Sequence, residues 1–461
     1  MKCYFEKDGK FLKVHNKNTT NWIEIGGIMG VTKERMISIE ERGYGESDKY
    51  VCSGCVKDQH LQKVIRARGQ VGICSFCKDE KGKPIRHRKT YPLESLMSEI
   101  MPAIDYYYMS TDGNIPYDQE TEQYLGSLID PYSFVYDVLA DEMQVEEPEL
   151  LKELFDLLEQ ENRTTIFEFV DRTSDKDLKA WAKFTSLVNG REEMSVEQIV
   201  SLCADNDAPD DLKEIHAVLQ VVLAHAKKLY AYTTINTEEP IYRCVNFHKL
   251  GFVPEGYTTI PATLVGTAPA KFAENGRFNE KGDMMFYGAT NPKIAVKEVG
   301  RKDDSPFTIG EFHTNKRIRV LNLSVVQSWK RPSSFSLEQE DIEKRESYLF
   351  LNQFIEQITL PVDNRNKADN YYKPIQVFTK YLQRVGNLHG IEYISSLADQ
   401  KQRHSDFVSD RCYVLFAENR DCMDELERPC KMNTKRLQLY MKNVYQTYDP
   451  QGKAGSNNDQ T

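Results

Sequence analysis

The chain has 461 residues, which at ~150 residues per domain suggests two to four domains. Hydrophobic residues make up 40% and charged residues 28%, a mix that excludes a disordered chain and a disulfide-bonded mini-protein, and the net charge of −10 disfavours a general polyanion binder. The longest apolar runs stay well short of the ~20 residues that span a bilayer, and the N-terminus lacks the apolar stretch of a signal peptide. A cytoplasmic location without a membrane partner is therefore expected.

Residues 1–90 are predicted to form an N-terminal segment with a short strand at Trp22–Ile25 and a four-cysteine module after residue 50. The module has two C-x-x-C pairs separated by 18 residues, Cys52 with Cys55 and Cys74 with Cys77. Each pair brings two thiolates to one side of a turn, and two such turns complete the tetrahedral sulfur shell that Zn²⁺ prefers. The spacing therefore predicts a structural zinc site, with chance pairing and a redox C-x-x-C as the alternatives.

Two segments depart from the average charge. Residues 56–89 hold ten Lys or Arg against three Asp or Glu, and residues 141–161 hold nine acidic residues against Lys152 alone. The ordinary interpretation of the acidic run is a solvated helix face. The basic run permits nucleic-acid binding, but a zinc knuckle that stabilises a small fold is the commoner outcome, so nucleic acid is not the expected partner.

Residues 91–235 are predicted to form a helical domain, because apolar residues recur at helical spacing over 150–158 and 218–226. Residues 236–447 alternate short extended runs with Gly-rich turns and short helices, which is an α+β pattern. Strands are expected at Glu239–Val245, Met284–Gly288, Phe307–Phe312, Ile318–Leu323, Ile391–Ile394 and Cys412–Phe416, and helices at Pro292–Val299 and Tyr372–Arg384. The polar residues 448–461 are expected to be a disordered tail.

Three polar residues of the C-terminal region stand out by their positions. Arg277 lies in a Gly-containing turn, Tyr287 ends an apolar run, and Glu298 lies near the C-terminal end of a short helix. A helix C-terminus disfavours an anion, so Glu298 is either exposed to solvent or held by a cation or a hydroxyl group. The pattern alone leaves open whether the three side chains converge on one cleft or are scattered.

A series of short motifs, taken in order, resembles the RES domain, which is named for its Arg, Glu and Ser. They are Ile241-Tyr-Arg243, Gly276-Arg277-Phe-Asn279, Tyr287-Gly-Ala289, Ala295-Val-Lys-Glu298, Tyr372-Lys-Pro-Ile-Gln376, Gly390-Ile-Glu-Tyr393-Ile-Ser395 and Tyr413-Val-Leu-Phe416. The zinc and helical region before them is similar to the extension that precedes RES domains in longer members of the family. The 96 residues between Glu298 and Ser395 exceed the spacing of compact members and include a charged run, 338–346, that is expected to be an added helix.

The resemblance implies a toxin-type enzyme that consumes NAD⁺ and has a fold similar to that of ADP-ribosyltransferases. Such an enzyme would cleave the nicotinamide–ribose bond as a glycohydrolase or phosphorylase, as a toxin or defence effector. An antitoxin, another regulatory protein or the N-terminal region itself would control it. Two other functions stay open, namely ADP-ribosyl transfer to a macromolecule and zinc-dependent nucleic-acid binding with an inactive RES domain. Oligomer formation is compatible with the sequence.

The same resemblance assigns roles to individual residues. By motif, Glu298 is the expected electrostatic catalyst, Arg243 and Arg277 are the pyrophosphate and ribose anchors, and Tyr287 is an aromatic wall. Ser395 would be a hydrogen-bond donor beside the ribose, and its distance from Gly390 and Tyr393 favours it over Ser396. The competing interpretations are a salt bridge at the edge of the core for Arg243, core packing for Tyr287, and ordinary surface positions for Arg277 and Glu298.

Overall fold

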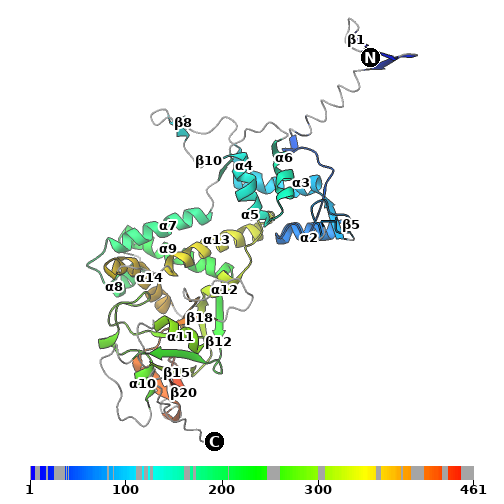
Figure 1. Cartoon of the computed structure of the whole chain (residues 1–461). Helices are drawn as coiled ribbons and strands as arrows, with labels where there is room; N and C mark the ends of the chain where they lie inside the picture. Colours follow the sequence, from blue (N-terminus) through cyan, green and yellow to red (C-terminus); the bar gives the residue numbers. More distant parts are fainter. Residues whose placement is uncertain are drawn as a thin grey trace. The chain divides into compact units, whose positions relative to one another are not determined.

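A computed structural model of the chain is shown in Figure 1, coloured along the sequence. It describes residues 2–5, 11–16, 19–24, 37, 39, 41–79, 82–86, 88–110, 117–118, 123–124, 128–159, 167–169, 173–205, 207–246, 260–299, 307–359, 365–385, 388–395, 410–427 and 435–447. The chain divides into two compact units. Unit 1 comprises residues 1–171 and 332–342, and unit 2 comprises residues 172–331 and 343–461.

A small sheet and one helix frame the four cysteines in unit 1. The sheet has the strand order β4-β6-β5, in which β6 (Arg88–Pro92) pairs antiparallel with both β4 (Tyr50–Cys52) and β5 (Gln70–Gly72). Helix α2 (Gln59–Arg68) begins after Asp58, whose carboxylate accepts a hydrogen bond from the backbone N–H of Leu61. This cap satisfies a donor that the first helical turn would otherwise leave unpaired.

The rest of unit 1 consists of helices over one apolar core and of short strands. The helical segments are α3 (Leu93–Tyr107), α4 (Pro131–Ser133), the π-helix η1 (Phe134–Leu139), α5 (Ala140–Met143) and α6 (Pro148–Glu159). The remaining strands are β1 (Lys2–Phe5), β2 (Phe11–Asn16), β3 (Thr19–Glu24), β7 (Tyr108–Ser110), β8 (Tyr117–Asp118), β9 (Gln123–Tyr124), β10 (Leu128–Ile129) and β11 (Phe167–Phe169). The strand expected at Trp22–Ile25 overlaps β3, and the helix expected over 150–158 is α6.

A segment from the second half of the chain also belongs to unit 1. The chain enters unit 1 at residue 332 and leaves it after residue 342. Phe335 is buried in the helical core of unit 1, and the Ser333 hydroxyl donates to Oδ1 of Asp58 at 3.0 Å. Asp58 therefore caps α2 and holds this returning segment with the same carboxylate.

Unit 2 is built on a nine-stranded mixed sheet with the order β12-β16-β17-β18-β14-β13-β15-β20-β19. Its strands are β12 (Tyr232–Ile235), β13 (Ile241–Val245), β14 (Phe286–Ala289), β15 (Phe307–Thr314), β16 (Ile318–Asn322), β17 (Gly390–Ile394), β18 (Arg411–Leu415), β19 (Cys422–Asp424) and β20 (Leu439–Thr447). The pairs β16–β17 and β19–β20 are parallel and the other pairs are antiparallel.

Alternation along the strands divides the core of unit 2 into two parts, one on each face of the sheet. On β18, Val414 packs into the larger core while its neighbours Tyr413 and Leu415 pack into the smaller one, as a period of two requires. Five helices contribute many of the other side chains of the larger core, which also includes residues of other strands and of short helices. The five helices are α7 (Thr173–Asn189), α8 (Val196–Cys203), α9 (Asp210–Lys228), α13 (Gln339–Thr359) and α14 (Arg365–Val385).

Short helices complete unit 2. They are α10 (Ala262–Val265), η3 (Ala270–Phe272), α11 (Pro292–Val299), α12 (Leu323–Ser328), η5 (Asn419–Asp421) and η6 (Glu425–Glu427). None of the helices that the structure describes combines the length and the apolar character that a bilayer crossing needs.

The predicted fold class, an α+β domain after a four-cysteine and helical region, is confirmed. All six expected strands are present, and the expected helix Pro292–Val299 has the predicted ends. The charged run 338–346 lies at the start of α13, as expected. The tail 448–461 lies outside the described residues, and the predicted domain boundaries stay predictions.

Candidate active site

A cleft of about 400 Å³ opens in unit 2 beside β13 and β14, two middle strands of the sheet. Side chains from β13, β14, β17, β18 and α11, and from the turn that carries Arg277, line it. The volume lies within the ~300–1,000 Å³ that small-molecule sites occupy. Arg243, Arg277, Tyr287 and Glu298, which are far apart in the sequence, all line this one cleft. The structure therefore brings together four of the five residues that the sequence singled out.

The cleft forms where two neighbouring strands stop pairing. Strand β13 pairs with β15 over five residues, but with β14 it shares only the pair Tyr242–Ala289. Gly288 permits close approach at that point, because a Cβ there would lie 2.5 Å from a side-chain carbon of Ile241. Beyond the pair, the guanidinium Nη1 of Arg243 donates to the carbonyl oxygen of Tyr287 at 2.7 Å. A side chain thus takes the place of the missing strand-to-strand hydrogen bond.

Arg243 is fixed by backbone carbonyl groups. Besides the bond to Tyr287, its Nε donates to the carbonyl oxygens of Val265 and Gly266 at 3.1 and 2.8 Å, and the guanidinium lies 5.4 Å from the ring centre of Phe286. Burial lowers the pKa of Arg243 from its usual value. Among the described residues no carboxylate forms an ion pair with Arg243, and its Nη2 has no hydrogen-bond partner there. That nitrogen is available to an anionic ligand.

Tyr287 contributes its ring to the cleft, while its hydroxyl group is used within the protein. The hydroxyl donates to Oδ1 of Asn279 at 2.6 Å. The amide nitrogen of Asn279 donates to the carbonyl oxygens of Glu274, Glu280 and Asp283 at 2.9, 3.0 and 3.1 Å, which fixes its orientation. Burial raises the pKa of Tyr287, so the phenol stays protonated at neutral pH.

Glu298 lies on α11 and is exposed, and two neutral side chains approach its Oε1. The Ser395 hydroxyl donates to its Oε1 at 2.5 Å, and the Cys412 thiol lies 3.6 Å from the same oxygen. Burial raises the pKa of Cys412, and the negative charge of Glu298 raises it further. This thiol therefore stays protonated. Ser395 is fully buried and is not among the residues that line the cleft, and its role beside the ribose stays a prediction. Ser396 lies outside the described residues.

Several residues of the site carry little signal in the sequence. Tyr393 and Cys412 line the cleft from adjacent strands, where they face each other as a cross-strand pair. Asn279 and Gln376 appear in the motifs, but their contacts with the turn around Arg277 depend on packing between distant elements. The only available signal was the strand alternation, which places Tyr393 and Ser395 on one face.

The four cysteines of unit 1 form a second polar cluster. Their sulfur atoms all lie within 4.8 Å of one another, with Cys55 3.2 Å from Cys77 and 3.6 Å from Cys74. A tetrahedral site with Zn–S bonds of ~2.3 Å has sulfur atoms ~3.8 Å apart. The predicted pairs therefore form a group that could hold a metal ion, and within the described part of the chain it is the single such group.

Arg88 is a cation that contacts two sulfur atoms of this cluster. Its Nη1 lies 3.7 Å from the sulfur of Cys52 and 3.5 Å from that of Cys77. The sequence analysis did not identify Arg88 as a partner of the cysteines. It reaches the sulfur atoms because β6, which begins at Arg88, pairs with β4, which ends at Cys52.

The two oppositely charged segments of unit 1 pair with each other. Lys57 lies 2.5 Å from Glu146 and Lys78 lies 2.7 Å from Glu149. Outside these segments, Glu99 on α3 accepts a hydrogen bond from Arg68. The positive charge of residues 56–89 is thus partly offset within the unit, which leaves less of it for a polyanion.

Fold and site together define an α+β domain with an Arg-, Tyr- and Glu-lined cleft, preceded by a four-cysteine and helical region. Two family models match the chain, the RES domain over residues 240–439 and the HEPN/RES N-terminal domain 1 over residues 67–201. The chain therefore carries a RES domain preceded by an N-terminal HEPN/RES domain. No curated protein and no solved structure gives a significant match.

Proposed function

We propose that the cleft binds NAD⁺ and cleaves the bond between nicotinamide and ribose, as a glycohydrolase or a phosphorylase. The observation that carries the proposal is the convergence of Arg243, Arg277, Tyr287 and Glu298 on one cavity of about 400 Å³. The family supports an activity on NAD⁺ through the resemblance on which these residues were first selected. A role as a toxin or defence effector, controlled by an antitoxin or by the N-terminal region, follows from the same resemblance.

The charges of the cleft suit a pyrophosphate. Arg243 and Arg277 are two cations, while Glu298 is the single carboxylate among the lining residues. Guanidinium groups match phosphate oxygens in geometry and charge, and Arg243 retains a free Nη2 among the described residues. The proposal therefore places the pyrophosphate beside the two arginines, with the nicotinamide ribose toward Glu298 and against the ring of Tyr287.

In this proposal Glu298 supplies the negative charge that favours cleavage of this bond. As the C–N bond breaks, its electron pair goes to the ring nitrogen, so neutral nicotinamide leaves and positive charge develops on the ribose. A carboxylate beside that carbon stabilises the charge as it forms. Water or phosphate then forms the new bond to the ribose carbon, and an attacking water releases a proton. Ser395 holds the carboxylate through Oε1, which makes it a positioning residue in this proposal.

We also propose that Zn²⁺ occupies the four-cysteine cluster as a structural ion. Four soft thiolate donors at tetrahedral spacing fit Zn²⁺, and Arg88 offsets part of their negative charge. The ion would join the end of β4 to the turn after β5 and so stabilise unit 1.

Two other functions are distinguished by the products. An ADP-ribosyltransferase would use the same cleft but would deliver the ribose to a macromolecule, so that label from NAD⁺ would remain on protein or nucleic acid. Nucleic-acid binding by unit 1 is the less favoured alternative, because ion pairs such as Lys57–Glu146 and Lys78–Glu149 offset its basic segment.

The direct test is to incubate the purified full chain with NAD⁺, with and without phosphate, and to analyse the products. We expect nicotinamide release, with ADP-ribose or its phosphate as the second product. The variant Glu298→Gln should lower the rate by ~10²-fold or more, since it removes the charge that stabilises the transition state. Lys297→Ala, an exposed change on the same helix, is the matched control and should keep the wild-type rate. Release that survives Glu298→Gln would reject the role of this carboxylate.

A further inference from the structure

The turn that carries Arg277 is held from behind by one buried amide. Gln376 on α14 is 4% exposed, and its Nε2 donates to Oδ1 of Asn275 at 2.8 Å. The same nitrogen donates to the carbonyl oxygens of Gly276 and Asn279 at 2.6 and 3.0 Å. These bonds fix the backbone on both sides of Arg277 and belong to the buried interior.

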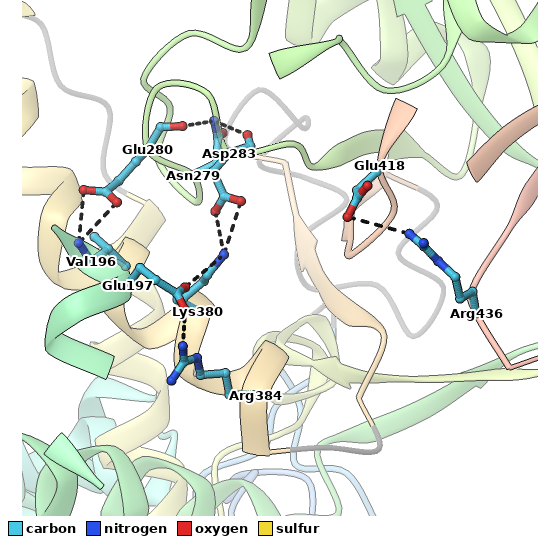
Figure 2. Close-up of polar contacts among 9 residues, drawn as sticks. All are labelled: Val196, Glu197, Asn279, Glu280, Asp283, Lys380, Arg384, Glu418 and Arg436. Carbon is cyan, nitrogen blue, oxygen red and sulfur yellow. Dashed lines mark hydrogen bonds and ion pairs between the residues drawn. The ribbon is translucent and has the colours of Figure 1, made fainter. Parts of the chain in front are cut away.

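A second set of contacts holds the far end of the same turn through charged side chains (Figure 2). The Lys380 ammonium on α14 lies 3.3 Å from Oδ1 of Asp283 and 3.5 Å from a carboxylate oxygen of Glu197 on α8. Arg384, one helical turn after Lys380, also pairs with Glu197. Burial opposes ionisation of Glu197, but the bond from Arg384 and the charge of Lys380 outweigh it and lower the pKa of Glu197. Glu197 is therefore ionised at neutral pH.

Helix α8 makes one more contact with the turn, at its N-terminus. Both carboxylate oxygens of Glu280 lie 3.2 Å from the backbone nitrogen of Val196, the first residue of α8. A carboxylate at this position accepts from a free backbone N–H and interacts favourably with the helix dipole. The turn from Asn275 to Asp283 is thus tied to α8 as well as to α14.

These outer ion pairs are suited to holding a loop rather than to stabilising the fold. The side chain of Lys380 is 19% exposed, that of Asp283 28% and that of Glu197 50%. Partly exposed pairs of this kind usually add little to the free energy of unfolding. A group that must contact a substrate within hydrogen-bond distance is far more sensitive, because a displacement of ~1 Å can cost ~10²-fold in rate.

We propose that Lys380 is a positioning residue for Arg277, acting by bridging Asp283 on the turn to Glu197 on α8. The idea rests on the proposed function, because it assumes that Arg277 contacts NAD⁺. Helix α8 lies mostly within residues 67–201, the part of the chain that matches the HEPN/RES N-terminal domain 1. The N-terminal extension therefore contributes to the support of the active site, and the RES domain of this chain depends on it for the placement of an arginine.

The test compares Lys380→Ala, Lys380→Arg and a matched control, Lys183→Ala, in the full chain. Lys183 forms an ion pair with Glu214 at 2.6 Å elsewhere in unit 2, so its loss reports the general effect of removing such a pair. Three quantities are measured for each protein. They are the amide hydrogen exchange of residues 274–283, the KM and kcat for nicotinamide release from NAD⁺, and the melting temperature.

We expect Lys380→Ala to speed hydrogen exchange in residues 274–283 and to raise KM by about 3- to 10-fold. Its melting temperature should stay within ~2 °C of the Lys183→Ala control, and Lys380→Arg should restore both exchange and KM. Glu197→Gln breaks the bridge from its other end and should reproduce the exchange result if Lys380→Ala folds poorly.

Exchange and KM that match those of the control would overturn the positioning role. A wild-type chain that releases no nicotinamide would instead reject the proposed function. In that case the exchange of residues 274–283 would still decide whether Lys380 holds the turn.

Discussion

The four-cysteine module and the cleft are both polar sites, but they draw on the sequence over different ranges. The four sulfur atoms come from a stretch of 26 residues, 52–77, and lie within 4.8 Å of one another. The cleft and its support collect Arg243, Glu298 and Ser395 from a stretch of 153 residues. The geometry of the module follows from the local spacing of its cysteines, whereas the geometry of the cleft depends on where β13 and β14 stop pairing.

This difference predicts two kinds of response to mutation. The module should fail as a whole when one ligand is lost, because a tetrahedral site needs all four sulfur atoms. Single mutations in the cleft should each reduce its activity by a different amount, because separate hydrogen bonds from different elements hold its residues. Mutations at the two sites test this contrast.

Replacing one ligand of the module should have the largest effect. We expect Cys74→Ser to lose all tightly bound zinc, because three thiolates and a weak hydroxyl ligand no longer satisfy the ion. Metal analysis of the purified protein by emission spectrometry measures this directly. Cys203→Ser, at a buried cysteine outside the cluster, is the control and should keep the metal. Equal metal content in the wild type, Cys74→Ser and Cys203→Ser would contradict the proposed zinc site.

Removing the cation beside the module should have an intermediate effect. Arg88 contacts the sulfur atoms of Cys52 and Cys77 without being a ligand, and loss of such an outer partner typically weakens metal affinity by ~10–100-fold. Competition with a chromophoric chelator gives the zinc affinity of Arg88→Ala. The control is Arg66→Ala, whose guanidinium bonds to Gln62 on the surface of α2. An unchanged affinity for Arg88→Ala would mean that its charge does not matter to the ion.

Loss of the Tyr287 hydroxyl alone should have the smallest effect on function. Tyr287→Phe keeps the ring but leaves the buried Oδ1 of Asn279 without its donor, which should cost ~1–3 kcal/mol of unfolding free energy. We expect kcat to fall by less than ~10-fold, because the hydroxyl serves Asn279 rather than the substrate. Burial raises the pKa of Tyr287 above its usual value, so its phenol stays protonated as pH rises from 6 to 9.

The pH profiles of nicotinamide release for the wild type and Tyr287→Phe should therefore have the same shape over that range. Denaturant unfolding of the two proteins gives the difference in stability. A Tyr287→Phe variant as inactive as Glu298→Gln would show that the hydroxyl itself takes part in the chemistry.

The parts of the molecule that local patterns determine were predictable. The C-x-x-C spacing predicted the sulfur cluster, and alternation with flanking turns predicted β13 to β18 within a few residues. The strands β12, β19 and β20 were not predicted, and β12 and β19 have only four and three residues over which alternation could be recognised.

Features that depend on long-range packing could not be read from the sequence. The single residue pair between β13 and β14 opens the cleft, yet nothing in either strand shows where their pairing ends. The hydrogen bond from the Ser395 hydroxyl to Oε1 of Glu298 joins residues 97 positions apart and has no local signal. The bridge from Lys380 to Asp283 and Glu197 joins three separate elements and has no local signature.

The central claim is that the cleft beside β13 and β14 holds one dinucleotide against Glu298. A crystal structure of the Glu298→Gln variant with NAD⁺ tests it most directly, because slow turnover should preserve the substrate. We predict the pyrophosphate within hydrogen-bond distance of Arg243 and Arg277, with the nicotinamide ribose facing residue 298 and the ring of Tyr287. NAD⁺ bound at another surface, or a cleft that stays empty at saturating NAD⁺, would contradict the account.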